Sequence, residues 1–282
     1  MNTLLKIFLT EAFLFISTIL LGIAVALRIE ELLVHASGGV DAAITIGAFL
    51  FYFLIATLLL LFFSRKGKSF FFRFILIFSV IIGGWLTLLP FLKEYSLPIL
   101  LLLVFFLIRK PFLFIHNICI IIAVAGVGAV IGISIDPFVV ILFATVLSLY
   151  DVIAVYKTKH MVKMAEGMVE SRAIMGIIIP LQLRDFFVDI KKTDLRNRFM
   201  ILGGGDIVIP LLMCVSLLSY GVGYSLMMLL FSFLGLAFSF MFFISPEVKR
   251  PIPALPPIVF MLIFGYIILE VFNHVGFFYM VS

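Results

Sequence analysis

Residues 199–220 read FMILGGGDIVIPLLMCVSLLSY, an apolar run whose only charged residue is Asp206. A transmembrane helix needs about 20 mostly apolar residues, because each residue adds about 1.5 Å along a helix that must cross about 30 Å of hydrocarbon. The run is therefore long enough to cross a membrane. An acidic side chain inside such a helix costs on the order of 2.5–3.5 kcal/mol. Asp206 thus indicates a functional site within a membrane protein.

The composition of the whole chain agrees with this interpretation. Of its 282 residues, 65% are hydrophobic and 12% are charged, whereas soluble domains are nearer half apolar and a quarter charged. A water-soluble fold of this length would lack the polar cover for so much apolar surface. The net charge of +5 is interpreted as membrane topology, so nucleic acid is not an expected partner. Cys119 and Cys214 lie inside apolar runs and are interpreted as buried free thiols, with no disulfide or metal site.

Nine apolar runs meet or approach the length of a transmembrane helix. They are Leu4–Leu27, Ala42–Phe63, Phe74–Leu92, Tyr95–Ile108, Phe112–Ile133, Pro137–Tyr156, Phe199–Tyr220, Tyr224–Ile244 and Pro253–Phe272. The sequence therefore predicts an all-α polytopic membrane protein of about nine transmembrane helices, forming one membrane domain over 1–282. Six helices are expected within 1–156, a soluble loop over 157–198, and three helices within 199–282. The first run exceeds the apolar core of a signal peptide and is expected to remain as a helix.

The basic residues divide unequally between the two ends of these runs. Of the 20 Lys and Arg residues, all but Arg28 and Lys93 fall on one side. Because cytoplasmic loops carry the excess of basic residues, the N-terminus and the loop 157–198 are predicted to be cytoplasmic and the C-terminus outside.

The loop 157–198 contains an apolar stretch, Ala173–Pro180, that is too short to cross a membrane. Its β-branched segment, Ile174–Ile179, favours a strand. An unpaired edge of that strand would accept an extended peptide by strand addition, which makes Ile177, Ile178 and Ile179 candidate substrate-binding residues. The alternative is a segment that lies along the membrane interface.

Four acidic residues lie in the predicted spans: Glu11, Asp151, Asp206 and Glu270. Glu11 and Glu270 are near helix ends, where a side chain reaches the interface, so a structural role is expected for both. Asp151 is about 9 Å from the cytoplasmic boundary and Asp206 about 12 Å from the same boundary, if both segments are helical. Because these two helices are consecutive and antiparallel, their carboxyl groups are expected to meet.

Two carboxyl groups in contact suit peptide hydrolysis. One acts as a general base toward water and the other, protonated, donates to the scissile carbonyl oxygen. Such a pair shares one proton and titrates as a unit. The alternative is a polar pair that only holds two helices together. Gly203, Gly204 and Gly205 permit close approach before Asp206 and loosen the helix, whereas Gly128 and Gly132 have the GxxxG spacing of helix packing.

A third segment, Pro253-Ala254-Leu255-Pro256-Pro257, enters the membrane from the cytoplasmic side and is expected level with the two aspartates. Its prolines hold the chain out of regular helix. Such backbone is tolerated at membrane depth where it lines protein or a water cavity. A plain helix start at an N-terminal proline is the alternative.

Together these three segments resemble a known family. Tyr150-Asp151, Gly203–Asp206 and Pro253–Leu255 occur in the order and spacing of the YD, GxGD and PAL motifs of presenilins and signal peptide peptidases. The resemblance covers essentially the whole chain. It implies a presenilin-like bundle that acts as an intramembrane aspartyl endopeptidase. Its substrates would be peptide bonds within transmembrane segments of membrane proteins or remnant signal peptides.

The resemblance also implies roles for particular residues. Asp151 and Asp206 would be the catalytic pair, supported by Tyr150, Gly203 and Gly205, and Pro253, Ala254 and Leu255 would shape the site or position substrate. No cofactor is implied. The chain lacks the long polar tail and extended loop of animal presenilins, so it is similar to compact microbial homologues. A plasma-membrane enzyme without obligatory accessory subunits is expected, and self-association stays open.

Two rival functions remain on the sequence alone. Paired intramembrane carboxylates also serve proton-coupled transporters, although the acids lie near one face and no inverted repeat is found. Prepilin-peptidase-type proteases also use a GxGD motif but have no counterpart of the proline-rich segment. A non-catalytic homologue is the remaining alternative.

Overall fold

The structure is a computed structural model that describes residues 2–34, 69–157, 160–190, 198–244 and 253–274. The main elements, in chain order, are α1 (Asn2–Val34), α3 (Ser69–Leu92), α4 (Ser96–Arg109), α5 (Leu113–Ile133), α6 (Pro137–Tyr156), α7 (His160–Ser171), β1 (Gly176–Pro180), η2 (Leu183–Phe187), β2 (Phe199–Gly203), α8 (Gly204–Ser216), α9 (Val222–Ile244) and α10 (Leu255–His274). Short 3₁₀ turns, η1 (Lys93–Tyr95) and η3 (Leu217–Tyr220), join α3 to α4 and extend α8.

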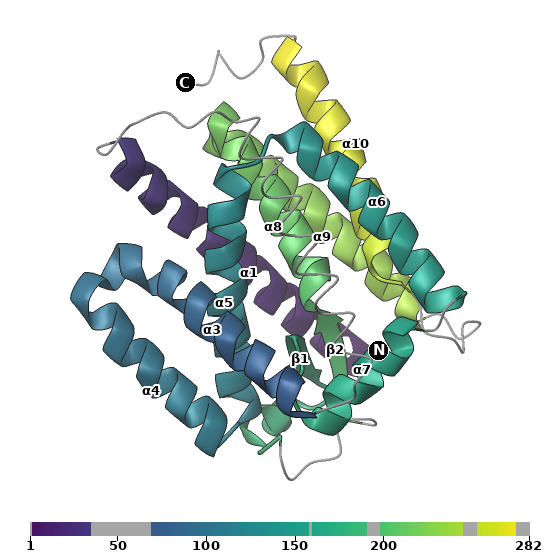
Figure 1. The fold of residues 1–282 in the computed structure, drawn as a ribbon. Helices are drawn as coiled ribbons and strands as arrows, with labels where there is room; N and C mark the ends of the chain where they lie inside the picture. The colour runs from purple at the N-terminus through teal and green to yellow at the C-terminus, as the bar shows by residue number, and fades with distance from the viewer. Residues whose placement is uncertain (1, 35–68, 158–159, 191–197, 245–252, 275–282) are drawn as a thin grey trace.

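Helix α5 lies at the centre of the bundle, packed against α1, α3 and α8 (Figure 1). Glycine residues of α5 explain why α8 can approach it so closely. A Cβ added to Gly128 would overlap the side chain of Leu211 on α8, and one added to Gly132 would lie 2.7 Å from the Val215 side chain. The GxxxG spacing of these two glycines therefore marks a helix contact, as the sequence predicted.

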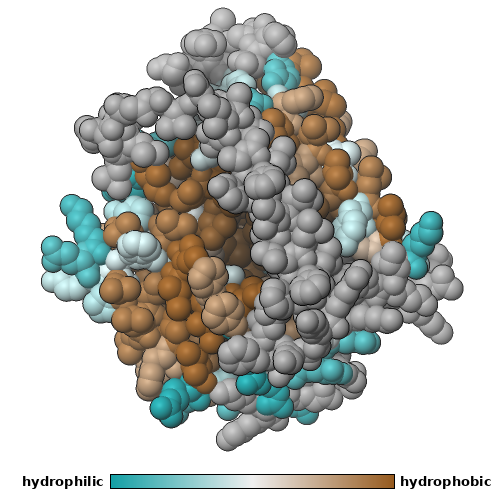
Figure 2. Space-filling view, viewed as in Figure 1, coloured by the Kyte–Doolittle hydropathy of each residue, from teal (hydrophilic) through white to brown (hydrophobic). Residues whose placement is uncertain are grey.

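The remaining helices surround this centre. Helices α3 and α4 form a pair on one side, while α6, α9 and α10 cover the other (Figure 1). Many large apolar side chains on these outer helices are exposed, including Phe74, Leu101, Leu149 and Phe260. Figure 2 shows the consequence on one face, where apolar residues cover most of the described surface and hydrophilic residues gather at its edges. Such a surface suits lipid contact.

Five candidate membrane spans are present in the described ranges: Leu4–Glu31, Phe72–Arg109, Leu113–Ile133, Pro137–Tyr156 and Val222–Ile244. Gly204–Tyr220 and Leu255–Val271 are shorter apolar helices. Phe72–Arg109 contains both α3 and α4, which pack against each other. The predicted span Ala42–Phe63 lies outside the described residues.

A two-stranded antiparallel sheet lies at one end of the bundle, beside α7 (Figure 1). Its inner strand, β1, overlaps the stretch Ile174–Ile179 that was predicted to be a strand and extends one residue beyond it, and all five residues of β1 are buried. One expectation is wrong here. The run Phe199–Tyr220 is not helical throughout, because Phe199–Gly203 pairs with β1 in the register Gly176↔Gly203 to Pro180↔Phe199. The fold is therefore predominantly helical, as predicted, with a small two-stranded sheet at one end of the bundle.

Candidate active site

Asp206 is placed by the change from strand to helix. Strand β2 ends at Gly203, which is the N-cap of α8, and Asp206 is the third residue of that helix. Its carboxylate accepts a hydrogen bond from the Gly203 backbone N–H. A helix begins with N–H groups that have no partner within the helix, and an acidic residue at the third position characteristically reaches back to the N-cap. Asp206 is thus anchored in the first turn of α8, and not within a continuous span.

Asp151 reaches the site from α6. Its side chain is 6% exposed, and its carboxylate accepts a hydrogen bond from the backbone N–H of Leu255, the first residue of α10. The next two residues, Pro256 and Pro257, have no N–H. Leu255 therefore offers the first free donor of this helix, and Asp151 fills the role of a capping residue supplied by another helix.

The two carboxyl groups come together as the sequence predicted. Asp206, which is half-buried, is close enough to Asp151 to interact with it electrostatically. The end of α6, the start of α8 and the start of α10 meet here, and all three helices pack against one another. The segments that carry the three motifs are thus joined at one end of the bundle.

The three glycines before Asp206 have different surroundings. A Cβ added to Gly203 would lie 2.9 Å from Asp206 Oδ2, and one added to Gly204 would lie 2.9 Å from the carbonyl oxygen of Met175. Apart from its chain neighbours and the backbone of its own helix, no heavy atom of the described residues lies within 4 Å of the Cβ position at Gly205, which is exposed. Gly203 and Gly204 are therefore constrained by the protein, whereas Gly205 borders open space beside the Asp206 carboxylate.

The hydrogen bonds that flank the sheet show which backbone groups face inward. The Gly204 N–H donates to the Met175 carbonyl at one end, and the Leu181 N–H donates to the Arg198 carbonyl at the other, both at 3.1 Å. Alternation along an antiparallel ladder then directs the backbone groups of every second residue toward the partner strand. Those of Ile177 and Ile179 face β2, whereas the groups of the residues between them face away.

The outer edge of β1 is already occupied. The Asn117 side chain of α5 donates to the Ile178 carbonyl at 2.7 Å and accepts from the Ile178 N–H at 2.9 Å. His116 Nε2 donates to the Gly176 carbonyl at 3.2 Å. Pro180 has no N–H to offer. We call the side chains of Asn117 and His116, which occupy this edge, the α5 brace. It leaves β1 no free edge for another strand.

The outer edge of β2, unlike that of β1, is not occupied by other described residues. By the same alternation, the backbone groups of Ile201 face away from β1, and no hydrogen-bond partner is found for them among the described residues. The Ile201 side chain is 39% exposed. The free edge of the sheet therefore belongs to β2, which leads directly into Gly203 and Asp206.

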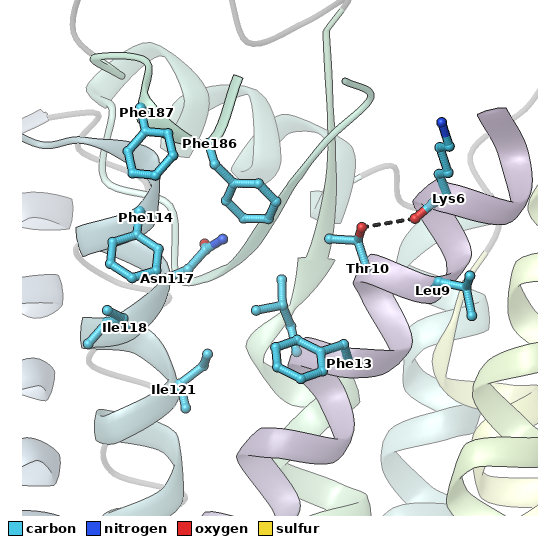
Figure 3. Close-up of a pocket in the computed structure, with 11 residues that line it drawn as sticks. Lys6, Leu9, Thr10, Phe13, Phe114, Asn117, Ile118, Ile121, Phe186 and Phe187 are labelled. Atoms are coloured by element: carbon cyan, nitrogen blue, oxygen red, sulfur yellow. Dashed lines mark hydrogen bonds between the residues drawn. The ribbon is translucent and has the colours of Figure 1, made fainter. Parts of the chain in front are cut away.

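A cavity of about 520 Å³ lies on the other side of the α5 brace (Figure 3). The described residues that line it come from α1, α5 and η2, and among them only Lys6, Thr10 and Asn117 have polar side chains. Phe13 of α1 and Ile121 of α5 face it, with Phe186 and Phe187 of η2 near one end. None of the residues of the three motifs lines this cavity.

Other residues singled out from the sequence lie as follows. Tyr150 precedes Asp151 but is 50% exposed, and Ile177, Ile178 and Ile179 are fully buried in β1. Pro253 is buried and Ala254 is half-buried, just before α10.

Glu11 departs from expectation. Its side chain is 3% exposed and does not reach the interface, and it interacts electrostatically with Asp206. Its acidic character inside a span was the available signal, but its position near a helix end led to the expectation of an exposed side chain.

Comparisons with known proteins agree with this geometry. A family model described as "Signal-peptide peptidase, presenilin aspartyl protease" matches residues 10–275. Two solved structures, each described as a presenilin family intramembrane aspartate protease, are similar in fold. The one in space group C222 has a TM-score of 0.56 and 23% identity, covering 92% of this chain and 95% of that chain. The one in space group P2 has a TM-score of 0.60 and 23% identity, covering 91% and 94%. A search of curated proteins gives no match.

Proposed function

We propose, on the premise that this chain belongs to the signal-peptide peptidase and presenilin family of aspartyl proteases, that it is an endopeptidase that cleaves transmembrane segments. The substrates would be membrane proteins or remnant signal peptides. The chain is an integral, multi-pass membrane protein, so its substrates reach it within the bilayer. The transporter alternative has no support from these comparisons.

One observation carries the proposal: the carboxyl groups of Asp151 and Asp206, which come from α6 and α8, interact at one end of the bundle. One carboxylate takes a proton from water, whose oxygen then attacks the scissile carbonyl carbon. The other carboxyl group donates its proton to the carbonyl oxygen. As the resulting diol collapses, one of its hydroxyl groups returns a proton to the pair, the C–N bond breaks, and the amine leaves with a proton from the pair. The two carboxyl groups thus return to their starting state.

The sheet suggests how substrate is held. A helix hides its carbonyl groups in internal hydrogen bonds, so the cleaved segment must first become extended. Because the α5 brace occupies the edge of β1, we place the extended substrate along the free edge of β2, and Ile177, Ile178 and Ile179 then support the sheet from within. This changes the sequence-based prediction that substrate pairs with β1 itself. Strand addition would lead the peptide past Gly205 toward Asp206.

Reconstituted cleavage of a model transmembrane peptide tests the proposal. The purified chain alone is expected to cleave the peptide, and Asp151→Ala or Asp206→Ala is expected to abolish cleavage. Because the aspartate pair is the target, a hydroxyl-containing transition-state mimic of aspartyl proteases should inhibit the wild type. Asp189→Ala in the soluble loop is the matched control and should retain activity. Full activity in either purified active-site variant would end the assignment.

A further inference from the structure

Glu11 is a buried acid that the reaction scheme above does not use. Its side chain on α1 is 3% exposed, and among the described residues its Oε2 has no hydrogen-bond partner. An acidic group at membrane depth costs free energy, and a buried carboxyl oxygen without a partner adds to that cost. Most such groups in folded proteins are satisfied by protein or by ordered water.

The surroundings of Glu11 point to the active site. Helix α1 packs against α5, α8, α9, α3 and β1. Of the charged groups on the described parts of those elements, Asp206 at the start of α8 is the one found to act on Glu11. The depth also fits. Glu11 lies about 10 Å along the helix from Leu4, where the apolar part of α1 begins, similar to the depth of about 9 Å expected of Asp151 on α6.

Water is the ligand that these observations favour. A buried water molecule characteristically makes two to four hydrogen bonds to polar groups that would otherwise lack partners. Glu11 Oε2 is such a group, and the Asp206 carboxylate nearby supplies further acceptors. The proposed reaction consumes one water molecule for each bond cleaved, within a bundle whose buried residues are mostly apolar. A polar site that retains water beside the aspartates would keep the supply close to the scissile bond.

We propose that Glu11 is a positioning residue that holds water for the Asp151–Asp206 pair. The inference rests on the proposed function. Glu11 donates or accepts hydrogen bonds with this water and undergoes no net proton change during the cycle, because the aspartate pair balances the protons of hydrolysis.

The test compares Glu11→Met and Glu11→Gln with wild type in reconstituted vesicles. Methionine has a similar shape but binds no water, so we expect kcat to fall by about 10- to 100-fold. KM for the peptide should stay within about twofold. Glutamine keeps hydrogen-bonding groups and should retain more of the activity than methionine does. Glu31→Met is the matched control, because Glu31 lies on the same helix but is exposed and paired with Arg28, and its kcat should equal that of wild type.

Binding of the transition-state mimic separates a water-holding role from a structural one. The hydroxyl group of the mimic takes the place of the attacking water, so its affinity for Glu11→Met should remain within about twofold of wild type. Unchanged kcat in Glu11→Met would overturn the inference, as would a parallel loss of kcat and of mimic affinity. If Glu11→Met does not fold, Glu11→Leu, which also binds no water, takes its place: a lower kcat with intact mimic affinity supports the inference, and unchanged kcat overturns it. A wild-type chain that neither cleaves the peptide nor binds the mimic would instead overturn the proposed function.

Discussion

At the scale of single residues, the position of the Asp206 carboxylate depends on the absence of a side chain at Gly203. Gly203 carries no side chain, which leaves room for Oδ2 where a Cβ would lie only 2.9 Å away. The same glycine donates its N–H to that carboxylate. Two residues further on, Gly205 borders open space. The run of glycines therefore performs two tasks, one toward Asp206 and one toward whatever enters the site.

Alanine at each of these two positions should separate the tasks. Gly203→Ala is expected to displace the Asp206 carboxylate and lower kcat by about tenfold or more, since misplaced catalytic groups are costly. Gly205→Ala meets no atom within 4 Å, so its thermal unfolding midpoint should be unchanged or higher, because alanine favours helix over glycine. Thermal unfolding in detergent and peptide cleavage measure the two effects. A Gly203→Ala variant with normal kcat would contradict this account.

The sequence predicted that the Asp151 and Asp206 side chains come together, but it did not predict that Glu11 is buried. Asp151 and Asp206 are recognised because each is an acidic residue inside an apolar run, and the two runs are consecutive in the chain. Glu11 lies near a helix end, and sequence position does not show whether such a side chain turns toward water or inward. The packing of α1 against its neighbours decides this, and the structure shows Glu11 buried.

At the scale of elements, the α5 brace leaves the small sheet with one free edge, that of β2. Asn117 matches the Ile178 peptide group with one donor and one acceptor, as a neighbouring strand would. The sheet therefore remains open only along β2. Sequence analysis finds the β1 strand from its β-branched residues, but it does not reveal the brace. Asn117 and Ile178 are 61 residues apart, and no local pattern links a helix side chain to a distant strand edge.

Removing the brace should loosen β1. Asn117→Leu leaves the buried Ile178 N–H and carbonyl without partners, and each such group costs roughly 1–3 kcal/mol. We expect a lower unfolding midpoint and faster hydrogen exchange in peptides that contain β1. Ile118→Leu, a neighbouring apolar change on the same helix, is the control. Protection of the Ile178 amide that equals wild type in Asn117→Leu would argue against the brace.

Proline scanning of β2 tests where substrate binds. Ile201→Pro removes an N–H that faces away from β1, so the sheet should persist while cleavage falls by about tenfold or more. Leu202→Pro removes an N–H of the ladder and should destabilise the fold. Cleavage rate and thermal midpoint are measured together. If Ile201→Pro folds and cleaves like wild type, substrate does not pair with this edge.

At the scale of the whole molecule, the site lies at one end of the bundle and not at its middle. Asp151 is near the end of α6, and Asp206 and Leu255 are in the first turns of their helices. Lys157 directly follows α6 and Arg198 directly precedes β2. Since basic residues favour the cytoplasmic side, that end is predicted to face the cytoplasm.

Substrates should accordingly be cut nearer their cytoplasmic ends. Mass spectrometry of the products of a model transmembrane peptide, with its orientation in vesicles fixed by a bulky soluble domain at one end, locates the cleaved bond. Asp206→Ala serves as the blank for background proteolysis. Products cut only near the outer end would contradict either the predicted topology or the placement of the site.

The overall architecture was predictable to the extent that length and apolar character determine it. Long runs such as Leu113–Ile133 and Pro137–Tyr156 cross the bundle as expected. The prediction of one continuous helix over Phe199–Tyr220 was wrong, because an apolar segment in a buried strand has the same composition as one in a helix. Pairing with β1, which is distant in sequence, decides between them.

The apolar cavity between α1, α5 and η2 touches the α5 brace but none of the three motifs. A compound shaped to fill it would press on Asn117 while leaving the aspartates and the edge of β2 free. We expect such a compound to slow turnover without competing for the peptide, because its effect would pass through the support of β1. The molecule would then offer two independent routes to inhibition, and the second would not require an imitation of the scissile bond.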